Sequence, residues 1–194
     1  SQLGSTSSLG NSDLLFQGDL GKWKKFGNSL MLRLALRLSK ADPSTSQAWA
    51  TKAIAGGVMT SNADIAYIQH LLGPDGWNKN GNGEVFMADG NPRLSKTFVD
   101  FLKDDPRLPI LGARRSDGST NPADLMGMPN GLTTGALEAK YGTTSAIYAE
   151  PNRGVITGED APMVFQTYAE VEFMMAEAIT KGWASGDAKA HYEA

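Results

Sequence analysis

The chain has 194 residues, which is enough for one globular domain with a substantial core. Its 18 basic and 21 acidic side chains give a net charge of −3, and basic residues gather only on one helical stripe, so nucleic acid is not expected as a partner. It contains no cysteine, which excludes disulfides, thiolate metal sites and a cysteine nucleophile.

The strongest periodic pattern runs from Gly21 to Lys40 and predicts the first helix. The expected buried face consists of apolar residues at spacings of three and four, namely Leu30, Met31, Leu34, Ala35 and Leu38. Basic and hydroxyl side chains repeat on another stripe, which we interpret as a solvated or interhelical face. Leu32 and Leu36 fall outside the main apolar face, which indicates that neighbours contact this helix on more than one side.

A second helix is expected to begin near Pro43 and to stop at Gly56. Because only a short turn separates it from the first helix, the two should pack as an antiparallel hairpin. Residues 59–73 follow with a loosely helical spacing of apolar side chains, but Tyr67 and the β-branched residues also fit a strand. Helix and strand both stay open for this segment.

Residues 73–90 are rich in Asn and Gly and predict a loop with tight turns. The spacing of a calcium-binding loop is matched by Asn78, Asn80, Asn82, Gly83 and Asp89. However, Asn occupies the first ligand position and the short Asp the last, so the ligand charge is low. An ordinary turn is therefore favoured over a metal site.

Helical spacing returns at residues 94–103, and residues 107–161 then form a long irregular region with many Pro and Gly residues. Loops of this length are uncommon in compact domains unless they are functional. A last long helix is predicted to begin at a capping box, in which Thr167 is the N-cap and the side chain of Glu170 reaches back to the Thr167 amide.

Aromatic side chains within the polar loops are the candidate binding residues. The predicted ligand-binding set is Trp77, Asn80, Tyr141 and Tyr148. A sugar ring has an apolar face and a rim of hydroxyls, so flat aromatic rings beside amide donors suit carbohydrate binding. The alternative, that these rings only anchor the loops to the body of the protein, stays open.

Chemistry beyond binding has little support in the sequence. Glu170, Glu172 and Glu177 suggest the paired carboxylates of a glycan-acting hydrolase, but acids near a helix start also complement the helix dipole. The two histidines, His70 and His191, lie far apart, and no phosphate-binding glycine motif is present. We expect no catalytic residue, no metal and no cofactor.

Four segments, in order along the chain, resemble the SusD/RagB family of outer-membrane nutrient-binding lipoproteins of Bacteroidetes. They are residues 18–43 (GDLGKWKKFGNSLMLRLALRLSKADP), 94–109 (LSKTFVDFLKDDPRLP), 128–132 (MPNGL) and 167–183 (TYAEVEFMMAEAITKGW). The resemblance implies an all-α, mainly helical fold of tetratricopeptide-like helix pairs with long irregular loops. Residues 1–194 would then be part of a single SusD-like domain, with both ends cut from a longer chain.

The same resemblance implies a function. Such proteins are surface-exposed lipoproteins of the outer membrane, held by a lipid anchor that here would lie upstream of the chain. They bind glycan or another nutrient for uptake through a SusC-like TonB-dependent transporter, and they are not enzymes. Two alternatives remain open: a helical-repeat protein-interaction module without a small ligand, and a glycan-acting hydrolase.

Overall fold

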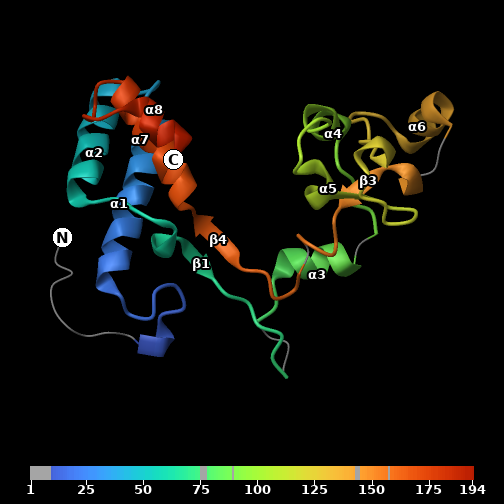
Figure 1. The fold of residues 1–194 in the computed structure, drawn as a ribbon, viewed down its shortest axis with the longest axis horizontal. Coiled ribbons are helices and arrows are strands. Elements are labelled where there is room, and N and C mark those ends of the chain that lie inside the picture. The colour runs from blue at the N-terminus through green and yellow to red at the C-terminus, as the bar shows by residue number, and fades with distance from the viewer. Residues whose placement is uncertain (1–9, 75–77, 89, 143–144, 157) are drawn as a thin grey trace. The chain divides into compact units, whose positions relative to one another are not determined.

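A computed structural model describes residues 10–74, 78–88, 90–142, 145–156 and 158–194 (Figure 1). The chain forms two compact units, which we call unit 1 (Ser1–Gln69 with Met163–Ala194) and unit 2 (His70–Pro162). The described part of the chain contains eight α-helices and only four short strands, so the expected mainly helical fold is confirmed. No helix in this part is both long and apolar enough to cross a membrane.

Unit 1 is built on two helix pairs, as the sequence predicted. The first pair is α1 (Leu20–Arg37) with α2 (Pro43–Gly56), and the second is α7 (Tyr168–Thr180) with α8 (Ala188–Glu193). The unit also holds the 3-10 helices η1 (Gly10–Ser12) and η2 (Asn62–Asp64).

Aspartate side chains begin the two helices of the first pair. Asp19 accepts a hydrogen bond from the amide of Lys22, and Asp42 accepts one from the amide of Thr45. These bonds satisfy amides that have no partner within the helix. The sequence therefore defines where both helices start.

The buried face of α1 differs from the predicted one. Leu32 is fully buried and Leu36 nearly so, whereas Leu34 is 62% exposed. The reason is that α1 contacts α2 and also α7, so the face between these two neighbours becomes the core. The buried core of unit 1 comprises Phe16, Leu32, Ala35, Leu36, Ala50, Ala53, Met59, Ala66, Val171 and Met174.

A two-stranded antiparallel sheet joins β1 (Ala66–Ile68) to β4 (Met163–Gln166) within unit 1. Ala66 pairs with Gln166 and Ile68 with Met163, with an irregularity after Ala66. The segment left open between helix and strand is thus a 3-10 turn followed by a strand. Its partner lies far away in sequence, so local spacing could not decide between the two.

Unit 2 consists of short elements wound around a small core. Its helices are α3 (Gly81–Ala88), α4 (Lys96–Phe101), α5 (Leu108–Leu111) and α6 (Thr134–Tyr141), with 3-10 turns η3 (Pro122–Asp124) and η4 (Ser145–Ile147). Strands β2 (Gly112–Arg114) and β3 (Ala149–Pro151) pair antiparallel. The buried apolar cluster comprises Val99, Leu102, Leu108, Leu125 and Ala149.

Gly127 allows two segments of unit 2 to meet at close range. The amide of Lys96 donates to the carbonyl of Met128, and the amide of Met128 donates to the carbonyl of Leu94, both at 2.8 Å. A Cβ atom on Gly127 would lie 2.5 Å from the Ser95 carbonyl oxygen and from the Lys96 Cα atom. Glycine is therefore required where these backbones touch.

Candidate functional site

The structure describes three of the four predicted binding residues, and these three differ in burial and in contacts. Trp77 lies outside the described residues. Asn80 is buried and begins α3: its side-chain oxygen accepts from the amides of Asn82 and Gly83, and its Nδ2 donates to the Ala161 carbonyl at 2.9 Å. In this conformation the Asn80 side chain holds the loop in place.

The two tyrosines lie at different depths in unit 2. Tyr148 is completely buried, and its carbonyl accepts a hydrogen bond from the Arg115 amide at 3.3 Å. Tyr141 is half-buried at the end of α6, where the Lys140 ammonium lies 5.5 Å from its ring centroid. Of this pair, Tyr141 is the ring that a ligand could reach.

Residues 81–88 form helix α3, not the turn-rich loop that the sequence predicted. A calcium loop wraps its ligands around the ion, which a continuous helix over these residues prevents. The oxygen of Asn80 is already used to cap the helix. Across residues 78–88 the described backbone is therefore not the conformation of a calcium-binding loop.

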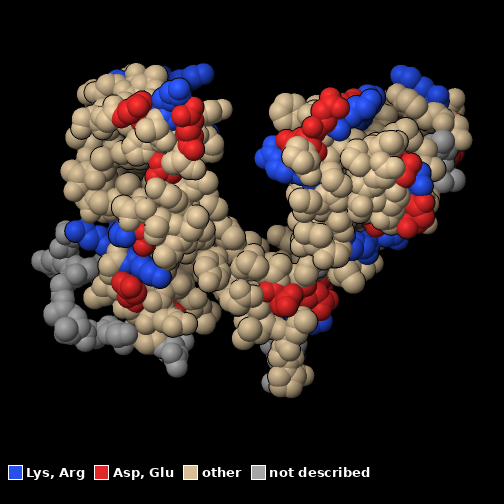
Figure 2. All heavy atoms as spheres, viewed as in Figure 1, with Lys and Arg blue, Asp and Glu red and all other residues tan. Residues whose placement is uncertain are grey.

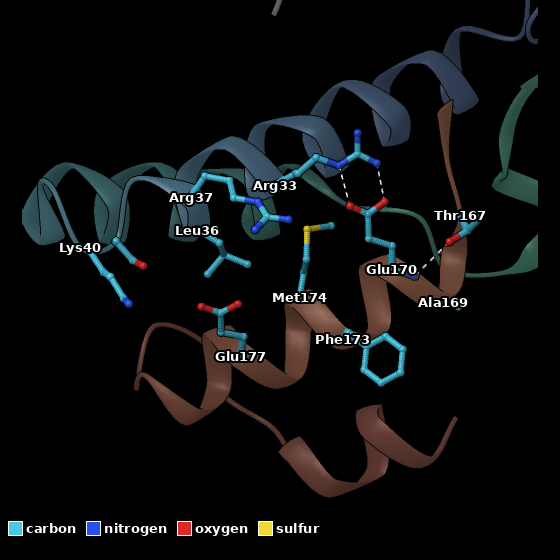
Figure 3. Close-up of a pocket in the computed structure, with 11 residues that line it drawn as sticks. Arg33, Leu36, Arg37, Lys40, Thr167, Ala169, Glu170, Phe173, Met174 and Glu177 are labelled. Carbon is cyan, nitrogen blue, oxygen red and sulfur yellow. Dashed lines mark hydrogen bonds and ion pairs between the residues drawn. The ribbon is translucent and has the colours of Figure 1, made fainter. Parts of the chain in front are cut away.

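A cleft of about 680 Å³ lies between α1 and α7 in unit 1 (Figure 3). Leu36 and Met174 are buried beneath it, and the ring of Phe173 is 54% exposed at its edge. Charged and hydroxyl side chains complete its lining: Arg33, Arg37, Ser39, Lys40, Thr167, Glu170 and Glu177. The volume falls within the range of about 300–1,000 Å³ that is usual for small-molecule sites.

Arg33 and Glu170 form a two-pronged ion pair across this cleft. Arg33 Nε donates to Glu170 Oε1 at 2.6 Å, and its Nη2 donates to Glu170 Oε2 (Figure 3). The same Nη2 also donates to the Phe165 carbonyl at 3.0 Å. The Glu170 amide donates to Thr167 Oγ1 at 3.1 Å, so Thr167 is the N-cap as predicted. The Glu170 carboxylate, however, binds Arg33 and does not turn back to Thr167.

The basic stripe of α1 is partly an interhelical face, as expected. Besides the Arg33 pair, Lys25 Nζ lies 2.8 Å from Asp64 Oδ2 in η2. Burial alone would raise the pKa of the Asp64 carboxyl, but hydrogen bonds from Lys25 and Thr60 outweigh it and hold the pKa below its usual value. This buried carboxylate ties the turn after α2 to α1.

Arg37 and Lys40 differ from the other basic residues of the stripe. Within the described residues, neither side chain makes an ion pair or a hydrogen bond. Glu177, which also lines the cleft, lies 3.6 Å from Lys181 on its own helix. Periodicity identified these cations on the stripe but gave no sign that they line a cleft, because α7 is distant in sequence.

An apolar groove of about 380 Å³ lies between α1 and α2. It is lined by Gly27, Leu30, Met31, Leu34, Ala35, Leu38, Thr45 and Trp49. It therefore contains the side chains that the sequence predicted as the buried face of α1.

The charged side chains of the protein surface are mixed in sign. On the face shown in Figure 2, basic and acidic side chains are interspersed among uncharged ones and form no broad basic surface.

The helix pairs and the loop-rich unit 2 define a class of helical scaffold proteins that present irregular loops. The family described as "Starch-binding associating with outer membrane" matches residues 2–194. The chain therefore belongs to the SusD-like family, and the predicted resemblance is confirmed. No curated protein is similar enough to the chain to match it.

Solved structures agree with this assignment. A SusD-like protein from Bacteroides thetaiotaomicron is 31% identical, with a TM-score of 0.74 over 98% of this chain and 37% of that protein. A chitin-binding protein is 27% identical, with a TM-score of 0.75 over 93% and 40%. A chitin-binding SusD homologue from Flavobacterium johnsoniae shares the fold at 24% identity, with a TM-score of 0.76 over 98% and 37%. The chain spans about two fifths of their length.

Proposed function

We propose that this protein binds glycan or another nutrient at the cell surface and passes it to a SusC-like TonB-dependent transporter in the outer membrane. The observation that carries the proposal is the family match over residues 2–194, whose description names starch binding and the outer membrane. The chitin-binding relative at 27% identity supports a carbohydrate as the ligand. Surface display through a lipid anchor is part of the same proposal.

Within unit 2, we assign the predicted binding residues to two tasks. Trp77 and Tyr141 contact the ligand, because aromatic rings stack against the apolar face of a sugar and Tyr141 is accessible. Asn80 and Tyr148 have structural tasks instead, since Asn80 caps α3 and Tyr148 is buried. Capture by rings and loops needs no catalytic group, in keeping with a protein that is not an enzyme.

Calorimetric titration with chito- and malto-oligosaccharides tests this assignment. Trp77→Ala and Tyr141→Ala should each weaken binding about tenfold, the loss expected when one aromatic stacking contact is removed. Tyr67→Ala is the matched control, because Tyr67 is 43% exposed on β1 of unit 1. Unchanged affinity in both ligand variants would reject the site. Failure of every oligosaccharide to bind would reject the ligand class.

The apolar groove between α1 and α2 favours one alternative, a helical-repeat module that binds another protein. Leu34 and Trp49 are 62% and 46% exposed there, and exposed apolar patches often mark protein contacts. Binding to a protein partner that is lost in Leu34→Asp, in a protein that binds no oligosaccharide, would favour this alternative.

The hydrolase alternative requires a carboxylate that is available to the substrate. Both oxygens of Glu170 are occupied by the guanidinium of Arg33, so this residue is poorly placed to act as an acid or a base. Oligosaccharide turnover that Glu170→Gln abolishes, in a variant that still folds, would restore the hydrolase.

A further inference from the structure

We infer that the cleft between α1 and α7 binds the acidic units of an oligosaccharide, through their carboxylate or sulfate groups. This inference rests on the proposed glycan-binding function but concerns a second site, in unit 1. Arg37 and Lys40 line the cleft and have no ionic partner within the described residues.

The charges of the cleft do not balance. Arg33 and Glu170 neutralise each other in their two-pronged pair, and Glu177 is shared with Lys181 at 3.6 Å. The lining therefore holds three cations against two carboxylates, a net charge of +1, and Arg37 and Lys40 are the two cations that no carboxylate of the described residues pairs with. This local excess occurs in a chain whose net charge is −3, so it is not a reflection of a generally basic surface.

The positions of the two cations suit an anionic group. In Figure 3 the Arg37 side chain extends from α1 toward Met174 of α7, and Lys40 extends from the turn that follows α1. A guanidinium offers parallel N–H donors that match the two oxygens of a carboxylate or sulfate. Lys40 lines the same cleft and would add a second positive charge to it.

The rest of the lining suits a sugar ring. Leu36 and Met174 form an apolar floor, and Phe173 presents an exposed ring that packs edge-on against Tyr192 with centroids 5.6 Å apart. An apolar surface beside cations matches a uronate or a sulfated sugar, which has a C–H face and a charged substituent.

Other occupants fit this cleft less well. A neutral sugar would displace water from Arg37 and Lys40 without supplying an anion, which is unfavourable. A docked amphipathic peptide needs a continuous apolar groove, whereas here the apolar floor is confined to Leu36 and Met174, each less than 10% exposed. The cleft therefore favours an acidic sugar over either of these.

Calorimetric titration with three small probes tests the inference. The probes are trigalacturonic acid for carboxylate, a sulfated chondroitin disaccharide for sulfate, and chitotriose as the neutral sugar. At least one acidic probe should bind the wild-type protein, and its affinity should fall as salt is raised, because salt screens charge pairs. Arg37→Gln with Lys40→Gln should weaken this binding at least about tenfold.

Matched variants show whether binding depends on the positive charge, on the planar guanidinium or on the position of the charge in the cleft. Lys52→Gln removes one positive charge from the exposed surface of α2, away from the cleft, and should leave affinity unchanged. Arg37→Lys keeps the charge but loses the planar fork, so it should weaken binding less than Arg37→Gln. Arg37 is exposed at the end of α1, and circular dichroism should show that each variant keeps its helices.

The outcomes distinguish this inference from the general proposal. Acidic probes that bind no better than chitotriose, or that bind the double variant as tightly as wild type, would overturn the cleft assignment. An acidic peptide such as tetraglutamate that binds the cleft in place of both acidic sugars would also overturn it. Trp77→Ala should reduce binding of neutral oligosaccharide only, so loss of the unit 2 site leaves the cleft measurable.

Discussion

Arg33 and Glu170 connect α1 to α7 across 137 positions of sequence, and the energy of this single pair can be measured. Exposed ion pairs contribute about 0–1 kcal/mol, but this one is partly buried and uses both carboxylate oxygens. We expect a coupling energy of about 1–2 kcal/mol in a double-mutant cycle of Arg33→Met and Glu170→Gln, followed by urea unfolding. A coupling energy near zero would show that the ion pair adds nothing to stability and that apolar residues alone hold α1 against α7.

Asp105 sets an expected pH dependence in unit 2. Hydrogen bonds from the Arg107 side chain, and then from its amide, lower the pKa of the Asp105 carboxyl from 3.8 to about 2. A carboxyl with a lowered pKa in the folded state stabilises the protein above the unfolded pKa, and this contribution disappears as pH falls toward 2. Asp105→Asn should therefore destabilise unit 2 at pH 6 but have little effect near pH 2.

The measurement for Asp105 combines urea unfolding at both pH values with carboxyl titration by NMR. Arg107→Gln serves as the control, because it removes the donor while leaving Asp105 in place, and it should return the Asp105 pKa toward 3.8. An equal loss of stability at pH 6 and pH 2 in Asp105→Asn would contradict the electrostatic explanation.

At the scale of elements, the contact at Gly127 holds unit 2 together. Gly127→Ala places a methyl group 2.5 Å from backbone atoms of Ser95 and Lys96, which cannot move aside as a side chain can. We expect a loss of about 1–3 kcal/mol in the unfolding free energy of unit 2, the usual cost of overpacking. Gly135→Ala in α6 is the control, since no atom lies within 4 Å of its added Cβ.

Gly135→Ala should be neutral or stabilising by up to about 1 kcal/mol, because alanine favours a helix and glycine does not. Thermal unfolding followed by near-ultraviolet circular dichroism checks both variants. If the two glycine variants lose stability equally, the close backbone approach at Gly127 would not be the cause of the loss.

The elements that could be predicted from sequence are those with enough length to show a period. Helices α1, α2 and α7 were expected from spacing and caps, and Thr167 is the N-cap of α7 as predicted. The buried face of α1 was not predicted correctly. Leu32 and Leu36 are buried because α1 packs against both α2 and α7, and only this tertiary packing decides which of two apolar stripes is buried.

The short elements of residues 107–161 could not be predicted for a related reason. Strands β2 and β3 have three residues each, too few for alternation to be recognised. The same limit applies to the candidate site: Tyr148 and Tyr141 lie in similar polar sequence, yet one is fully buried and the other half-exposed. Arg37 and Lys40 form a cleft only because α7 folds against α1.

At the scale of the whole molecule, unit 2 is an insertion between paired strands of unit 1. Ile68 and Met163 are direct partners in the β1–β4 sheet, so the chain leaves and re-enters unit 1 at one point. Replacing residues 69–162 with Asn-Gly would close this pair with a two-residue hairpin turn. The shortened chain should keep the helices of unit 1 and unfold cooperatively, as judged by circular dichroism.

The same shortened chain tests where ligands bind. It should lose the affinity for neutral oligosaccharide that Trp77 and Tyr141 provide, and it should keep the binding of acidic probes at Arg37. An unfolded product would show that unit 1 depends on unit 2 for its stability. The double variant at Arg37 and Lys40 in the 194-residue chain would then remain the measurement of the cleft.

The β1–β4 pairing also bears on the order in which the two units fold. All residues of unit 2, from His70 to Pro162, precede α7 in the chain, so unit 2 holds every residue of its own core and can fold before α7 packs. Unit 1 differs, because Leu32 and Leu36 of α1 stay uncovered on one side until Val171 and Met174 pack against them. A folded unit 2 shortens the loop that this closure must span, because it brings the two strands toward each other before α7 packs.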